Sequence, residues 1–284
     1  MEAPYALLEP LEPGIARLLA ANPSPFTFTG TQSYLVGEEE VVVIDPGPDL
    51  PAHVDAILAA LGKRRLLAIA CTHTHRDHSP ASRPLAAATG APIIGCAALS
   101  LDGVGPRADA SFDGDYRPDR VLEDGEAIEV DGLALTTVAT PGHTSNHLCF
   151  AYRGALFTGD HVMGWSTSVV VPPDGDMGDY MASLDKLRAR DDRIYYPAHG
   201  PAVEKPQQLV RGMMGHRLQR ERQIVKRLKE GDRTVPEIVA AAYPGLDPRL
   251  VAAAGGSVTA HLLDLERRGL VVRHEGESWT TASL

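Results

Sequence analysis

Four side chains that can bind a metal ion or carry a proton stand close together in the segment THTHRDH, which begins at Thr72. They are His73, His75, Asp77 and His78. The first two are two residues apart, so on an extended backbone their rings point the same way. The other two follow where the chain turns toward a helix, and they can approach from another side. One segment can therefore supply ligands to two neighbouring ions, unless it is only a polar surface loop.

Three further potential ligands decide between these interpretations. His143 follows the apolar run LTTVAT, Asp160 follows ALFTG, and His199 follows DRIYYPA, each in a loop that contains glycine. Taken singly, His143 or His199 is better explained as a structural histidine. Taken with the first segment, seven nitrogen and oxygen ligands fit two zinc-like ions that share one bridging carboxylate.

The elements that position these residues are alternating strands and helices. The run from Leu66 to His73 is typical of a buried strand that ends in a functional loop. Asp131-Gly132 is a strong hairpin turn, and Arg153-Gly154 repeats it. Strand pairs interrupted by helices predict two packed sheets with helices outside. Strands are expected within residues 29–48, 66–73, 91–96, 125–142, 146–162 and 192–201, and helices within 52–62, 82–90 and 179–190.

Composition limits the class of protein. The 284 residues allow one large and one small domain, and a net charge of −10 argues against a surface coated by nucleic acid. No run is long enough for a membrane span, and the acidic, proline-rich start resembles neither a secretory signal nor a transit peptide. Three scattered cysteines, Cys71, Cys96 and Cys149, are expected to be buried thiols. We therefore expect a cytoplasmic protein that does not bind membranes.

The ordered pattern HxHxDH, His, Asp, His resembles the metallo-β-lactamase superfamily over about Phe28 to Pro201. The resemblance implies an αβ/βα sandwich, an α/β fold with a dinuclear metal site. Asp45, in VVVIDPG, would support a ligand by hydrogen bonding from outside the coordination shell. The implied ligands are His73, His75 and His143 for one ion, Asp77, His78 and His199 for the second, and Asp160 as the bridge.

Departures from the family pattern narrow the branch. Common zinc β-lactamases are secreted and have a cysteine where this chain has Asp160, so antibiotic hydrolysis is not expected. His199 follows Asp160 too soon for the domain that related nucleases insert between these two motifs. Thioester hydrolases of the hydroxyacylglutathione hydrolase type, lactonases and compact ribonuclease-like members remain. Gln32, where asparagine is usual, and the sequence SPAS after His78 affect the expected pocket shape but remove no ligand.

The C-terminal part predicts a winged-helix-like module. A long helix is expected over 204–230, short helices within 234–243, 247–255 and 258–269, and a hairpin over 270–282. The corresponding domains are 1–203, catalytic; 204–231, a connecting helix; and 232–284, winged-helix-like. With the pattern HRxxRExQI at 216–224, this module resembles the β-lactamase-like protein 2 group. That group includes a single-strand endoribonuclease and fungal thioesterases.

Two segments are expected to shape substrate binding. Residues Gly164–Asp176 are predicted to lie over the metals and to set specificity. A mildly basic lid containing Arg217, Arg220 and Arg222 could hold phosphates, although the favoured interpretation is a solvated helix face or pairing with Glu221. The module could equally cap the site or mediate dimerisation, so a homo-oligomer stays open. His147 and His161 are expected to have supporting or structural roles.

The sequence therefore predicts a metal-dependent hydrolase with two divalent ions, zinc first and manganese or iron as alternatives. A hydroxide between the ions, oriented by Asp77, would attack the substrate. Single-stranded RNA ranks slightly above a small-molecule thioester, ester or lactone, on the resemblance alone. The non-enzymatic alternative is a regulatory winged-helix protein with a degenerate metal domain, and the intact ligand set counts against it.

Overall fold

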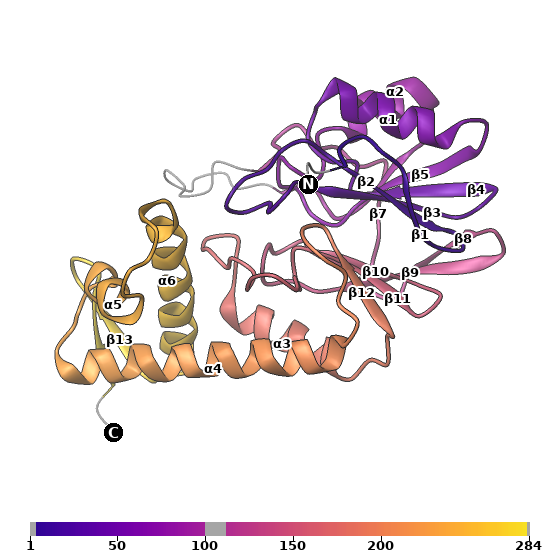
Figure 1. The fold of residues 1–284 in the computed structure, drawn as a ribbon. Coiled ribbons are helices and arrows are strands. Elements are labelled where there is room, and N and C mark those ends of the chain that lie inside the picture. Colours follow the sequence, from indigo (N-terminus) through magenta and orange to yellow (C-terminus); the bar gives the residue numbers. More distant parts are fainter. Residues whose placement is uncertain (1–3, 100–111, 283–284) are drawn as a thin grey trace.

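Two sheets packed face to face form the larger part of the protein (Figure 1). The computed structural model describes residues 4–99 and 112–282. The first sheet has the order β1 (Glu9–Glu12), β2 (Ile15–Leu19), β3 (Gln32–Val36), β4 (Glu40–Ile44), β5 (Arg65–Cys71), β6 (Ile93–Gly95), β7 (Arg120–Val121). The second has the order β12 (Ile194–Pro197), β11 (Ala155–Gly159), β10 (Leu148–Tyr152), β9 (Leu133–Ala139), β8 (Ala127–Val130).

Helices cover the outer face of each sheet. The helices α1 (Pro51–Leu61) and α2 (Ser82–Thr89) lie on the first sheet, whereas α3 (Met177–Arg188) and α4 (Pro206–Glu230) lie on the second (Figure 1). Between the sheets, the Tyr34 and Phe157 ring centroids are 4.9 Å apart. The predicted αβ/βα sandwich of the metallo-β-lactamase fold is thereby confirmed.

Local sequence accounts for most of these elements. Asp131 and Gly132 both have positive φ, 50° and 74°, as a two-residue hairpin turn between β8 and β9 requires. The pair β1–β2 was not predicted, because proline interrupts the segment EPLEPG. Pro10 is tolerated there because β1 is an edge strand. Among the described residues, the backbone groups on its outer edge pair with no neighbouring strand, so the missing N–H of proline costs no sheet hydrogen bond. All three cysteines are free and buried, as expected.

The C-terminal part is a winged-helix domain with its own small core. It contains α5 (Val235–Ala242), a 3₁₀ turn at Pro248–Leu250, α6 (Val251–Arg267), β13 (Val271–His274) and β14 (Ser278–Thr281). The two helices expected within 247–255 and 258–269 are wrong as separate elements, because α6 runs without a break through Gly255 and Gly256. A glycine is needed at 256 because the Val171 side chain packs directly against its Cα.

The long helix α4 carries the chain from the sandwich to this domain, and α6 returns toward the sandwich and contacts α3 (Figure 1). Arg267 of α6 forms an ion pair of 2.7 Å with Asp176 at the start of α3. In the described ranges, no helix combines the length and the apolar character that a membrane crossing demands.

Candidate metal centre

The loops that follow four strands meet at one edge of the sandwich. His73, His75, Asp77 and His78 follow β5, His143 follows β9, Asp160 follows β11, and His199 follows β12. In the two groups that these residues form, the nitrogen and oxygen atoms offered to a metal all lie within 4.8 Å of one another, and Asp160 belongs to both groups. The structure therefore brings together all seven residues that the sequence singled out.

Three histidines form one half of the centre. His75 Nδ1 lies 3.0 Å from His73 Nε2 and 3.2 Å from His143 Nε2. Asp160 Oδ2 is 3.7 Å from His143 Nε2. The ligand atoms of one tetrahedral zinc ion stand roughly 3.3 Å apart, because each is about 2.0 Å from the metal. These separations match a single cation held between the four side chains.

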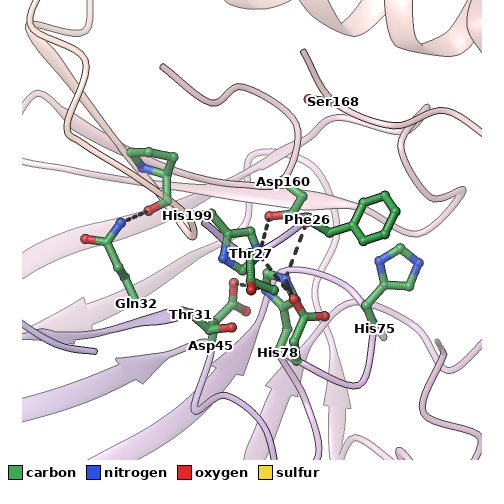
Figure 2. A network of polar contacts seen from close by, with 12 residues as sticks. Phe26, Thr27, Thr31, Gln32, Asp45, His75, His78, Asp160, Ser168 and His199 are labelled. Atoms are coloured by element: carbon green, nitrogen blue, oxygen red, sulfur yellow. Dashed lines mark hydrogen bonds and ion pairs between the residues drawn. The ribbon is translucent and has the colours of Figure 1, made fainter. Parts of the chain in front are cut away.

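The other half combines two histidines with two carboxylates (Figure 2). His199 Nε2 is 3.2 Å from Asp77 Oδ2 and 3.2 Å from Asp160 Oδ1. His78 Nε2 is 3.4 Å from Asp77 Oδ2 and 3.5 Å from Asp160 Oδ2. His78 Nε2, His199 Nε2 and Asp160 Oδ1 are buried without a hydrogen bond. Buried polar atoms left in this way need a partner, and a divalent cation between them would provide it. The donor set thus fits two metal ions.

Asp45 orients the loop that carries the first four ligands. It follows β4 directly and precedes a Pro-Gly turn. It is 1% exposed, and its Oδ1 accepts a hydrogen bond of 2.8 Å from the Thr72 backbone N–H. Its Oδ2 accepts from the Thr72 hydroxyl at 2.8 Å and from His78 Nδ1 at 3.0 Å. A carboxylate that accepts from one ring nitrogen would leave the other nitrogen, here His78 Nε2, to bind a cation.

The remaining ligands are oriented through the same principle. The ring nitrogen Nδ1 of His143 donates to the Val169 carbonyl at 2.5 Å, and Nδ1 of His199 donates to the Gly30 carbonyl at 3.1 Å. In each case this bond would leave the opposite nitrogen, Nε2, which faces the centre, to offer its lone pair when a cation is bound. The segment Gly164–Asp176, predicted to lie over the metals, therefore holds one ligand through a backbone carbonyl.

Two further histidines lie beside the ligands. His147 Nε2 accepts from the Asp160 backbone N–H at 3.3 Å, and its Nδ1 is 2.9 Å from the Thr140 hydroxyl. This geometry agrees with a supporting role for His147. His161 is fully buried, and neither of its ring nitrogens has a hydrogen bond. Its ring packs against Tyr180, with centroids 4.7 Å apart, which is a structural contact.

The histidine pKa values differ between the two halves of the centre. Burial and the neighbouring His143 lower the pKa of His75 to about 3, and burial with His78 and His75 holds the pKa of His73 well below its usual range. The other half behaves differently. Burial alone would lower the pKa of His199, but Asp160 and Asp77 raise it to about 10. Without cations, carboxylate–imidazolium pairing thus stabilises this half, and protons compete with metal there.

Aromatic residues that the sequence analysis did not single out flank the centre. Phe26 and Phe28 are each 47% exposed, and every other Phe, Tyr or Trp in residues 4–99 and 112–282 is buried or half-buried. The Phe28 and Trp165 rings lie 5.1 Å apart. Trp165 packs directly on Gly200, the residue after His199, where a Cβ would lie 2.4 Å from its ring. Figure 2 shows the Phe26 ring at the edge of the cluster, toward Asp160 and His75. The segment SPFTFTG, which has two phenylalanines among turn residues, was the sequence feature that could have predicted exposed aromatic rings.

Hydrogen bonds hold the loop 22–31, which carries Phe26 and Phe28, and join the strand after it to the His199 loop. Phe28 has a φ of +56°, a region that bulky residues rarely adopt. The Asn22 side chain braces the loop by accepting from the Thr31 N–H at 2.9 Å and donating to the Thr31 hydroxyl at 2.9 Å. Gln32 donates to the Gly200 carbonyl at 2.6 Å and to the Pro197 carbonyl at 3.1 Å, so its longer side chain ties β3 to the His199 loop (Figure 2).

The expected arrangement of arginines on α4 is wrong. Arg217 is only 4% exposed, and its guanidinium lies 5.1 Å from the Tyr180 ring centre. Arg220 stacks on Tyr243 at 3.8 Å and donates to the Ala242 carbonyl at 2.7 Å. Glu221 pairs with Arg268, the residue after α6, instead of an α4 arginine. Of the three arginines, only Arg222 is exposed. The predicted long helix is present, but α6 and α3 cover the face that carries Arg217.

Comparison with known proteins agrees with this geometry. A family model described as the metallo-beta-lactamase superfamily matches residues 26–199. The chain belongs to the metallo-β-lactamase superfamily. A second model, the beta-lactamase associated winged helix domain, matches residues 234–279. The chain thus joins a metallo-β-lactamase domain to the winged-helix domain that accompanies it in relatives.

Individual relatives of this superfamily member cover most of its length. A β-lactamase-like protein 2 homolog of Caenorhabditis elegans is 34% identical over 231 residues, 78% of this chain and 74% of that protein. An atrochrysone carboxyl ACP thioesterase of Cryptosporiopsis is 31% identical over 233 residues, 80% of this chain but only 66% of that protein. A solved metallo-β-lactamase family protein of Thermus thermophilus shares the fold with a TM-score of 0.78 and 23% identity, covering 96% of this chain and 100% of that one.

Proposed function

We propose that this protein is a dinuclear metal-dependent thioesterase that hydrolyses thioesters with a bulky, flat hydrophobic acyl group. The observation that carries the proposal is the exposed ring of Phe28, which contacts the half-buried Trp165, together with the exposed ring of Phe26, beside the His199 loop. Exposed aromatic rings fixed at the mouth of a polar centre are suited to bind a hydrophobic ligand. A relative at 31% identity is named an atrochrysone carboxyl ACP thioesterase, which supports thioester hydrolysis as the reaction class.

The ligand roles are proposed as the sequence predicts. His73, His75 and His143 would hold one cation, Asp77, His78 and His199 the second, with Asp160 between them and Asp45 supporting His78. Zinc is the first candidate because its ligands are mainly imidazole, with manganese or iron as alternatives. Two such cations would lower the pKa of water toward neutrality and polarise a carbonyl oxygen.

Asp77 is the side chain that we assign to orienting the attacking water. It is the most exposed ligand of its half, with 24% of the side chain accessible against 12% for Asp160 and 1% for His199. An acceptor at the open side of the centre can fix the direction of the water's O–H bonds while the acyl carbonyl approaches from solvent. Hydrolysis of the thioester then yields a carboxylate and a thiol.

The contacts of the α4 arginines make RNA a less favoured substrate. A phosphate-binding lid on α4 would need several exposed arginines, and two of the three candidates donate to carbonyls or stack on tyrosines inside the protein. The helix α6, which could otherwise face a partner, packs against α3 and pairs Arg267 with Asp176. These observations favour a small-molecule substrate over a nucleic-acid strand.

Parallel turnover assays on the metal-loaded protein test the proposal. The substrates are naphthoyl and acetyl thioesters of pantetheine and a labelled single-stranded RNA. We expect the naphthoyl thioester to be preferred, and Phe28→Ala to lower its kcat/KM roughly two- to tenfold, the value of one aromatic contact. The acetyl thioester should be unaffected by this change.

Leu218→Ala, an exposed apolar side chain on α4, is the matched control and should change neither rate. Faster cleavage of RNA than of either thioester would contradict the proposal and restore RNA to first rank. A chain that binds two metals but turns over none of the three substrates would instead favour the regulatory, non-enzymatic alternative.

A further inference from the structure

We infer that Arg217, on α4, positions the metal ligand His143 through the Ser168–Val169 segment. The three-histidine half of the centre then depends on the C-terminal part of the chain. The inference rests on the proposed metal site but not on the identity of the substrate. It explains a buried guanidinium that neither the fold nor the proposed reaction otherwise uses.

The contacts form a short and continuous path. The Arg217 guanidinium donates through Nη2 to the Ser168 carbonyl. The next carbonyl along the chain, that of Val169, accepts from His143 Nδ1 at 2.5 Å. Ser168 is further fixed by its hydroxyl, which donates to the His161 carbonyl at 2.7 Å. One residue of backbone therefore separates the arginine's hydrogen bond from the one that orients the metal ligand.

Burying this guanidinium is costly, which argues that the contact is more than incidental. Arg217 is 4% exposed, its Nε has no hydrogen bond, and no carboxylate pairs with it in residues 4–99 and 112–282. Its guanidinium contacts the Ser168 carbonyl and the face of the Tyr180 ring, whose centroid lies 5.1 Å away. A leucine or methionine would fill such a place at lower cost if packing were all that the site required.

The winged-helix domain holds the same segment at a second point. Val171 packs on Gly256 of α6 so closely that a Cβ there would lie 2.6 Å from Val171 Cγ2. Farther along, Asp174 Oδ1 accepts from the Ser145 N–H at 3.0 Å and from its hydroxyl at 2.7 Å, which returns the segment to the His143 loop. The segment 168–174 is thus fixed between the ligand loop and the C-terminal helices.

The consequence concerns one cation more than the other. His143 belongs to the three-histidine half, whereas the Asp77, His78 and His199 side is oriented by Asp45 and the Gly30 carbonyl. Loss of the Arg217 donor would free the Ser168 and Val169 carbonyls to move, and the His143 ring would lose its fixed orientation. Removing the group that hydrogen-bonds a ligating histidine weakens metal binding about 10- to 100-fold, and because Arg217 acts one residue farther out, its loss should cost about tenfold.

The test measures metal affinity of the full chain by chelator competition, together with the visible spectrum of the Co²⁺-loaded protein. We expect Arg217→Met to weaken one of two sites about tenfold and to change the Co²⁺ spectrum. Arg217→Lys, which keeps the charge and a donor, should recover part of the affinity. Arg222→Met, at the exposed position five residues later, should bind as the wild type does.

A second pair of variants tests the same segment without touching a charge. Gly256→Ala places a methyl group against Val171 and should weaken the same site, although alanine favours the helix. Gly255→Ala is its control, because a Cβ there meets Val235 at an ordinary 3.6 Å. If Arg217→Met and Gly256→Ala both keep wild-type affinity at both metal sites, the inference is overturned but the proposed function is not. A wild-type chain that binds no metal would overturn the proposed function as well.

Discussion

Replacement of Asp45 by asparagine is the sharpest perturbation of the centre that leaves every ligand in place. The carboxylate accepts three hydrogen bonds from groups on the ligand loop, two at Oδ2 and one at Oδ1. An asparagine amide can turn its NH₂ toward the Thr72 N–H or toward His78 Nδ1. Either orientation sets a donor against a donor in a position that is 1% exposed.

The expected magnitude follows from these contacts. A buried donor left without its acceptor costs about 1–3 kcal/mol, so the metal-free variant should unfold more easily by that amount. Loss of the carboxylate behind a ligating histidine weakens metal binding about 10- to 100-fold, or about 1.4–2.7 kcal/mol. The loss should fall on the site that contains His78, because His143 and His199 are held by backbone carbonyls instead.

Backbone conformation makes asparagine the correct choice. Asp45 has a φ of +49°, and asparagine tolerates this left-handed region. Asp45→Ala would add conformational strain of about 1–2 kcal/mol and confuse the interpretation. Chelator competition at pH 7 reports the affinity of each site, and urea denaturation of the metal-free protein reports stability. Two sites of unchanged affinity in Asp45→Asn would refute the proposed support of His78.

Two other predictions concern the bridge and pH. Elemental analysis of the wild-type protein should find close to two metal ions per chain. Asp160→Ala should lower this metal content and abolish turnover, because this carboxylate contacts both halves of the centre; wild-type turnover would refute the bridging assignment. Burial, with Arg217 next, lowers the pKa of His261 from 6.5 to about 3, so between these values the unfolded chain binds a proton that the folded chain does not. Stability should therefore fall as pH drops below 6.5, by up to about 1.4 kcal/mol per pH unit from this group. His261→Leu should flatten that slope in urea denaturation at pH 7 and pH 5, and an unchanged slope would show that other groups cause it.

The sequence by itself determined the identity of the polar residues and the strands that end at them. The run from Leu66 to Cys71 is a strand because it is apolar and bounded by turn residues, and Asp131-Gly132 makes a hairpin because both residues accept positive φ. These are local properties, readable within a few residues. The resemblance to the family added which of the two metal ions each ligand should bind. That assignment stays a prediction until metal binding is measured.

Only the tertiary structure decided which side chains are buried and what they contact. Arg217 and Arg222 have the same chemistry on the same helix, yet α3 and the Ser168 segment bury one and leave the other in solvent. Gly255 and Gly256 look like a helix end, but Val171, far away in the chain, packs on Gly256 and makes its small size useful inside α6. Phe28 and Trp165 meet over a separation that no local pattern encodes. Burial depends on the surface that another segment presents, so it is settled only when the distant segments pack together.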